Sequence, residues 1–228
     1  MEFVLLGWPE AGPTLRLDYR RFAYAGKFVM SNTGKAVVRD PNASDGHSGS
    51  DDPREERDDT QRGRENARRG REDVHQEHDV DRPAPPNPQE FDDSVLAAAA
   101  FNADRTDPGV CWLRYVTVDR ERRGEGLGPK LAAFVAERAL DRGFRRLRIA
   151  VNNPFAYEAM YKAGFVYTGR QTGLAELVLE RPGLRDRATY QCGLDEYRDR
   201  ELGDPEASFL AERRGAEPPA LLKPPSSP

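Results

Sequence analysis

Sulfur and histidine are scarce in this chain. Its 228 residues include only two cysteines, Cys111 and Cys192, too few for a disulfide framework or a cysteine metal site. We therefore expect a protein of the reducing cytoplasm that binds no metal. The three histidines, His47, His75 and His78, all lie in one strongly polar stretch. Such a stretch cannot hold a base beside a nucleophile, so histidine-activated serine or cysteine catalysis is not expected.

Long apolar runs and a large net charge are absent as well. No run reaches the roughly 18 apolar residues that suggest a membrane-spanning helix. The opening MEFVLLGWPE holds a short apolar run without a basic flank, so we expect neither a signal peptide nor an anchor. The formal net charge is −4, which argues against a general nucleic-acid binder. Neither a nucleic acid nor a membrane is therefore an expected partner.

Residues 41–90 lack aromatic side chains, and their five apolar residues are all Ala or Val. The same stretch holds 14 acidic residues and eight arginines. It cannot bury enough apolar surface to offset the entropy lost on ordering. We predict a disordered, charged insertion over 41–92, which separates N-terminal strands in 1–40 from a core in 93–182. Residues 183–228 are predicted to form short helices and a loose C-terminal tail.

The rest of the chain alternates between strand and helix patterns. Strands are predicted over 14–19, 34–40, 94–101, 110–118 and 144–151, with two closing strands in 166–181, and helices over 129–143 and 152–165. The strand, helix and strand within 110–151 predict a βαβ unit with a right-handed crossover. The strands 34–40 and 94–101 are expected to pair antiparallel, with the insertion at their tip. The fold class is therefore α/β, with a mixed sheet.

The stretch RRGEGLGPKL places Gly124, Gly126 and Gly128 between a predicted strand and a predicted helix. Glycines at such a turn let bare backbone N–H groups approach an anion, most often a phosphate. A P-loop does not fit, because three residues separate Gly124 from Gly128 and Pro129 follows. The dinucleotide motif G-x-G-x-x-G does not fit the spacing either. A flexible turn without a ligand is the third alternative, but it leaves the preceding arginines unexplained.

The stretch 123–128, RGEGLG, resembles the R/Q-x-x-G-x-G/A motif of the GNAT acyltransferases. The preceding YVTVDRER resembles the fourth strand of that family, and NNPFAYEAMYKAGF resembles its second motif. The resemblance covers residues 110–180 and extends over 91–109. It is weaker in 1–40, and it does not include 182–228. It implies a GNAT-like acyl-CoA N-acyltransferase fold.

The same resemblance implies a binding mode for acetyl-CoA as co-substrate. Its pyrophosphate would lie on the backbone N–H groups of 124–130. Because Pro129 has no N–H, Lys130 is expected to supply the next donor. In this family two strands splay apart near Val116 and Val118, whose backbone groups then bind the pantetheine arm. The implied binding residues are Val116, Val118, Arg123, Gly124, Gly126, Gly128, Lys130 and Asn153.

The implied reaction is direct attack of an amine, on a small molecule or a protein, on the thioester. Histone-acetylating relatives carry a glutamate base on the fourth strand, at a place that falls near Arg114 here. No acid lies on WLRYVTV, so a base elsewhere is needed, and the candidates are water and Glu176. The rival hypothesis is a CoA-binding sensor or interaction protein without turnover, which acts through its charged segment. A homodimer is left open.

Relatives commonly protonate the departing thiolate with a tyrosine four residues before a Gly-Phe pair. Met160 occupies that position here, and Tyr161 follows it. Tyr161 is therefore the candidate general acid, provided that the helix ends slightly differently. The alternatives are protonation by water, or simple packing of Tyr161 together with Tyr157 one turn earlier.

Overall fold

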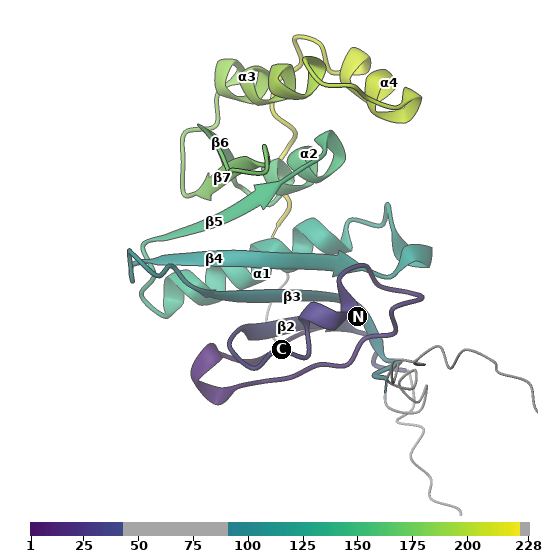
Figure 1. Cartoon of the computed structure of the whole chain (residues 1–228), viewed down its shortest axis with the longest axis vertical. Coiled ribbons are helices and arrows are strands. Elements are labelled where there is room, and N and C mark those ends of the chain that lie inside the picture. The colour runs from purple at the N-terminus through teal and green to yellow at the C-terminus, as the bar shows by residue number, and fades with distance from the viewer. Residues whose placement is uncertain (43–90, 224–228) are drawn as a thin grey trace, which may run out of the picture. The chain divides into compact units, whose positions relative to one another are not determined.

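The structure is a computed structural model, and it describes residues 1–42 and 91–223. Within these residues seven strands form one sheet in the order β1-β2-β3-β4-β5-β7-β6 (Figure 1). The strands are β1 (Glu2–Gly7), β2 (Gly34–Arg39), β3 (Val95–Ala103), β4 (Val110–Val118), β5 (Arg146–Val151), β6 (Val166–Gln171) and β7 (Leu177–Arg181). Only β4 and β5 pair in parallel; the other neighbours are antiparallel. The predicted mixed sheet and the predicted hairpin of β2 with β3 are both confirmed.

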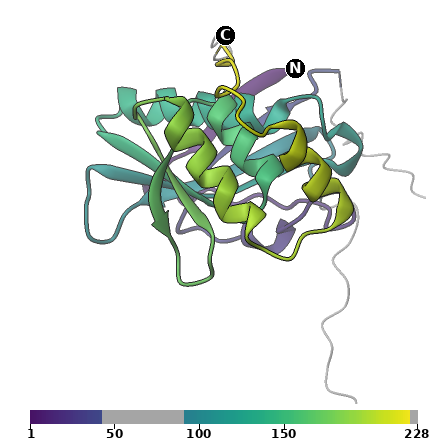
Figure 2. The same cartoon turned by 90° about the horizontal axis from the view of Figure 1, so that it is seen from above.

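The helices of the described residues pack mainly on one face of the sheet. They are α1 (Leu127–Asp141), α2 (Pro154–Lys162), α3 (Arg187–Arg198) and α4 (Asp204–Glu212). Three short 3₁₀ turns accompany them: η1 (Pro9–Ala11), η2 (Ala25–Lys27) and η4 (Arg120–Arg122). None of the helices within the described ranges is long and apolar enough to cross a membrane. Figure 2 shows α3 and α4 lying on the α2 side of the sheet.

Strand β3 is buried on both faces. Ala97 and Ala99 belong to the core shared with α1, whereas Ala98 and Ala100 pack under the segment 12–33 on the opposite face. Because alanine is small, both covering layers can lie close to the strand. The run SVLAAAAF is thus the central strand that its apolar character predicts.

One predicted strand is wrong, and one observed strand was missed. Residues 14–19 lie across the sheet rather than in it, and Leu15 donates its N–H only to the carbonyl of Phe28 (3.0 Å). Leu15 and Leu17 are buried at alternate positions, so burial alone produced the strand-like pattern. The edge strand is β1 instead, which pairs with β2.

The predicted helix boundaries hold closely. Asn153 caps α2 by accepting the N–H of Ala156 (2.8 Å), and α1 begins at Leu127, two residues earlier than predicted. The predicted short helices near the C-terminus are α3 and α4, and α4 begins at Asp204. The predicted disorder of 41–92 concerns mostly residues outside the described ranges, as does the end of the tail.

Candidate active site

Strands β4 and β5 separate at the middle of the sheet. They pair only from Val110 with Arg146 to Leu113 with Ile149, although β4 continues to Val118. Beyond that point β5 keeps its pairing with β7 on the other side. The N–H of Asp119 donates to Leu96 on β3 (3.0 Å). Since backbone groups alternate sides along an antiparallel strand, those of Val116 and Val118 face the gap.

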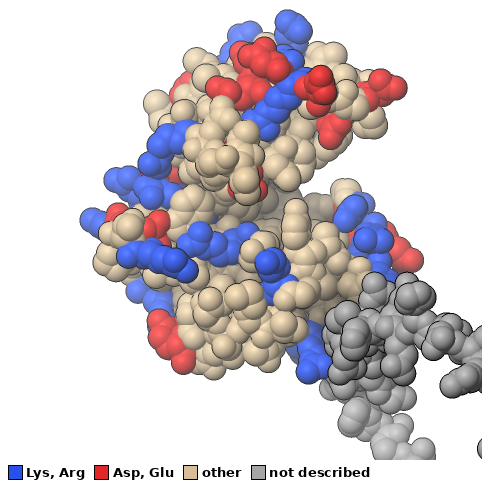
Figure 3. Space-filling view, in the orientation of Figure 1, with Lys and Arg blue, Asp and Glu red and all other residues tan. Residues whose placement is uncertain are grey.

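A cavity of about 1120 Å³ opens at this gap. It lies between the part of the molecule that carries α2 to α4 and the part that carries β4, where Figure 3 shows the surface hollowed. Its wall is built from the end of β4, the glycine loop, the end of β5 and one side of α2. The members from these parts are 114–118, 122–130, 149–153, 155, 156, 159, 160 and 162. The volume slightly exceeds the range typical of pockets for drug-sized ligands, which suits a long ligand.

The glycine loop presents backbone donors to the cavity. Gly124 and Gly126 have left-handed φ values of +88° and +75°, which favour glycine. Gly126 caps α1, so the N–H groups of Gly126, Leu127 and Gly128 have no acceptor within the helix. No other residue in the described ranges accepts them either. The helix dipole adds positive potential at this end, and the loop is suited to bind an anion.

The expected role of the Lys130 backbone is wrong. Its N–H donates to the carbonyl of Gly126 (3.2 Å), as the first regular bond of α1. The side chain of Lys130 still lines the cavity, together with Arg122, Arg123 and Lys162. Arg122 is paired with Glu125 and Lys162 with Glu158 (2.8 Å each), so Arg123 and Lys130 are the two that can add positive charge near the free N–H groups.

Gly128 lies against the free end of β4. A Cβ atom at this position would lie 3.4 Å from Val118 Cγ2 and 3.9 Å from Val116 Cγ1. These are ordinary van der Waals distances, so an alanine would fit here, and the first turn of α1 lies directly against the free end of β4. The glycine loop and the unpaired backbone at the end of β4 therefore lie side by side.

On the α2 side, Met160 lines the cavity and Tyr161 does not. Tyr161 is fully buried, and its hydroxyl accepts the backbone N–H of Tyr167 (3.1 Å). Its ring packs against Tyr157 and Tyr190, and burial raises its pKa. Tyr157 is also fully buried and donates its hydroxyl to the carbonyl of Tyr190 (3.1 Å). The geometry therefore argues against Tyr161 as the general acid and favours the packing alternative.

Glu176 lies in the cavity wall, at the start of β7. Its Oε2 accepts the hydroxyl of Thr172 (3.2 Å), and its N–H donates to the same hydroxyl (3.3 Å). The candidate base is thus held in place by a turn rather than by an ion pair. Asn153, in contrast, commits its Oδ1 to capping α2, and its Nδ2 donates to Asn152 Oδ1 (3.0 Å).

Several wall residues were not anticipated from the sequence. Tyr24 lies on the segment before β2, with its ring 5.7 Å from that of Tyr115 on β4. Its φ of +59° is unusual for a tyrosine. Glu206 and Leu222 reach the cavity from the C-terminal region. No local pattern marks these residues, because they come to the site through packing of distant segments.

Within residues 1–42 and 91–223, no group of three or more His, Cys, Asp or Glu side chains could hold a metal ion.

The family model "Acetyltransferase (GNAT) family" matches residues 51–165, half of the chain. Among solved structures, an N-acetyltransferase from Staphylococcus aureus is 23% identical, with a TM-score of 0.35; the match covers 38% of this chain and 60% of that one. A GCN5-related N-acetyltransferase from Kribbella flavida is 27% identical, with 40% and 61% covered and a TM-score of 0.34. An acetyltransferase from Bacillus subtilis, solved with CoA, is 16% identical, with 40% and 72% covered and a TM-score of 0.35.

The match thus spans about three fifths of the staphylococcal and Kribbella structures. The search of curated proteins found no match. The glycine loop, the adjoining βαβ unit and α2 all lie inside the matched range of the family model. The chain belongs to the GNAT acetyltransferase family.

Proposed function

We propose that this protein is an N-acetyltransferase that moves an acetyl group from acetyl-CoA to an amine. The observation that carries the proposal is the cavity itself. There the free N–H groups at the start of α1 lie beside the unpaired edge of β4. One end of the cavity suits phosphates, and the other offers an extended backbone to a ligand that carries amides.

The residues present fit CoA. The N–H groups of Gly126, Leu127 and Gly128 would receive its pyrophosphate, with Arg123 and the Lys130 ammonium nearby. The pantetheine amides would bond to β4 at Val116 and Val118 as an added strand. This arrangement leaves the thioester toward the point, beyond Leu113, at which β4 and β5 begin to separate.

The proposed chemistry needs no covalent enzyme intermediate. The lone pair of a neutral amine attacks the thioester carbon and forms the C–N bond, the nitrogen then gives up a proton to solvent, the C–S bond breaks, and the thiolate leaves. A backbone N–H near Val116 would stabilise the oxyanion. Because an ordinary alkyl amine is mostly protonated near pH 7, it must first lose a proton, and Glu176 or water would accept it. With Tyr161 buried, solvent is the proposed source of the thiol proton.

Calorimetry with acetyl-CoA and a turnover assay across an amine panel together test the proposal. We expect binding, and release of free thiol that depends on both the amine and the protein. Glu176→Gln should lower the rate at neutral pH without weakening acetyl-CoA binding. Absence of binding would refute the proposal.

Tight binding without thiol release from any amine would support the rival hypothesis of a CoA-binding protein without turnover. The absence of a carboxylate on β4 within WLRYVTV and the buried hydroxyl of Tyr161 are the observations that favour this rival. The acceptor could be a small molecule or a protein amine, so the panel should contain both kinds.

A further inference from the structure

A buried carboxylate stands where β4 leads into the glycine loop. Asp119 is 3% exposed, and its N–H donates to Leu96 on β3 (3.0 Å). Its Oδ1 accepts the N–H of Glu121 (3.1 Å), and its carbonyl accepts the N–H of Arg122 (3.0 Å). Asp119 thus shapes the first turn of the loop that contains the free N–H groups.

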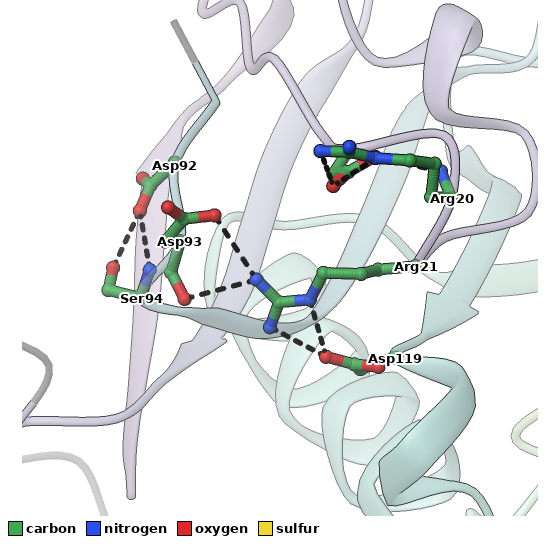
Figure 4. Close-up of polar contacts among 7 residues, drawn as sticks. Arg20, Arg21, Asp92, Asp93, Ser94 and Asp119 are labelled. Atoms are coloured by element: carbon green, nitrogen blue, oxygen red, sulfur yellow. Dashed lines mark hydrogen bonds and ion pairs between the residues drawn. The ribbon is translucent and has the colours of Figure 1, made fainter. Parts of the chain in front are cut away.

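Arg21 holds this carboxylate from a distant part of the chain. Its Nε and Nη2 both donate to Asp119 Oδ2, at 2.9 and 2.6 Å (Figure 4). Its own carbonyl accepts the N–H of Arg120 (3.0 Å). Its Nη1 donates to Asp93 at the start of β3 (3.3 Å to Oδ1). Both the side chain and the backbone of Arg21 therefore bind the beginning of the glycine loop.

The same arginine precedes the opposite wall of the cavity. Phe22, directly after it, is buried under the sheet, and Ala23 and Tyr24 then line the cavity. The Tyr24 ring rests near Tyr115 on β4, with the ring centroids 5.7 Å apart. Arg21 does not line the cavity itself. Arg21 therefore connects the segment that carries Ala23 and Tyr24 to the start of the glycine loop.

We infer that Arg21 is a positioning residue for the whole site, which orders the glycine loop for the coenzyme and holds Tyr24 in the wall on the other side. The inference rests on the proposed function, because it assigns acyl-CoA to the glycine loop. The two Arg21 donors on one buried oxygen of Asp119 fix both the position and the orientation of that carboxylate. A lysine, with its single flexible ammonium, cannot reproduce this geometry. Loss of the pair leaves Asp119 buried without its cation and frees the start of the loop.

The test compares Arg21→Ala with Arg20→Ala. Arg20 is a matched control, because it forks onto Asp18 (2.9 and 2.7 Å), whose carboxyl is also nearly buried, but contacts nothing in the glycine loop. Acetyl-CoA binding is measured by calorimetry, and kcat and KM are measured for an amine that the wild type accepts. Melting temperatures report the structural cost of each change.

We expect Arg21→Ala to raise the Kd for acetyl-CoA by roughly tenfold or more, since small displacements of a binding group have large effects. KM for the amine should rise as well, while kcat at saturation changes far less. Arg20→Ala should leave Kd and KM near the wild-type values even if its melting temperature falls as much. Equal effects of the two variants on Kd, or none from either, would overturn the inference.

Arg21→Lys and Asp119→Asn keep the test decisive if Arg21→Ala does not fold. Arg21→Lys keeps the charge but loses the paired donors. Its melting temperature should therefore stay closer to the wild-type value than its affinity for acetyl-CoA does. Asp119→Asn keeps the acceptor for Glu121 and should weaken acetyl-CoA binding in the same direction. Unchanged Kd in both folded variants would refute the positioning role. If instead the wild type does not bind acetyl-CoA, the proposed function fails, which is a separate outcome.

Discussion

Two glycines at opposite ends of α1 share a left-handed backbone but not their surroundings. Gly126 has a φ of +75° and carries a free N–H in the cavity wall, whereas Gly143 has a φ of +98° just beyond the C-terminal end of the helix. Neither has close neighbours that a Cβ would strike. Valine should strain both backbones by about 1–2 kcal/mol. Only Gly126→Val should also turn the N–H of residue 126 away from the cavity. Calorimetry should therefore show a loss of acetyl-CoA affinity for this variant alone.

Gly143→Val is the control for that variant, because it carries the same strain without touching the loop. Similar losses of affinity in the two variants would show that the phosphate assignment of the loop is wrong.

We expect Tyr161 to contribute to the stability of the fold and not to catalysis. Tyr161→Phe removes the acceptor of the buried Tyr167 N–H, so the free energy of unfolding should fall by about 1–2 kcal/mol. Denaturant titration measures that loss. The kcat should remain close to the wild-type value. A fall of roughly 10²–10⁴ in kcat, the range for one general acid, would instead restore Tyr161 as the proton donor.

Lys35 is a fully buried lysine on β2. Its ammonium donates to the carbonyls of Met30 and Thr33 (2.8 Å each), but burial outweighs these bonds and lowers its pKa to about 8. Between this pKa and the unfolded value near 10.4, the unfolded chain binds more protons, so stability rises with pH. At pH 7 the group is charged in both states, and the penalty for burying the charge is complete.

From pH 7 to pH 10 the wild type should therefore gain roughly 2 kcal/mol relative to Lys35→Met, which has no titrating group there. Paired denaturant titrations at the two pH values measure the difference. A constant difference would show that Lys35 keeps an ordinary pKa in the folded state.

At the scale of elements, α4 is attached to α2 through an ion pair and a ring contact. Glu158 on α2, which is 8% exposed, binds both Lys162 (2.8 Å) and Arg213. Burial by itself raises the pKa of Glu158. The hydrogen bonds from Arg213 and Lys162 have a larger effect in the opposite direction, so the pKa of Glu158 is lowered overall. The rings of Phe155 and Phe209 meet at 4.7 Å beside the cavity. This attachment places Glu206 of α4 in the cavity wall.

Arg213→Ala should therefore destabilise the fold by about 2 kcal/mol, because the buried carboxylate keeps only Lys162 and a long hydrogen bond from the Tyr190 hydroxyl (3.4 Å). Arg214→Ala is the matched control, as Arg214 is exposed and pairs with no carboxylate in the described part of the chain. Thermal melting of both variants gives the comparison. Equal melting temperatures for the two would contradict a structural role for the ion pair.

At the scale of the whole molecule, the described segments on either side of residues 41–90 lie next to each other. Asp40 donates its N–H to Ser94 (2.9 Å), and Arg39 binds Asp92 (2.7 Å). We predict that replacing 41–90 by a short turn changes the free energy of unfolding by no more than about 1 kcal/mol. Acetyl-CoA affinity should stay within about twofold. Melting and calorimetry test both statements, and a large loss of stability would contradict the predicted disorder.

Local patterns were sufficient for much of the fold. Helical spacing in 129–141 predicts α1, and Asn153 followed by Pro154 predicts the start of α2, because caps act within one turn. The strand pattern of 14–19 failed, since alternate burial of Leu15 and Leu17 does not reveal whether a ladder partner exists. Periodicity records which side chains are buried, not which backbone groups pair.

The sequence by itself determined the βαβ unit and the glycine loop, because turns, caps and glycine conformations depend on residues close together along the chain. Only the tertiary structure decided which groups meet at the cavity. Met160 faces it while Tyr161 is buried, owing to the way α2 packs against α3. Arg21 reaches Asp119 across 98 positions of the chain. Contacts of that kind follow from the packing of whole elements, which no local pattern records.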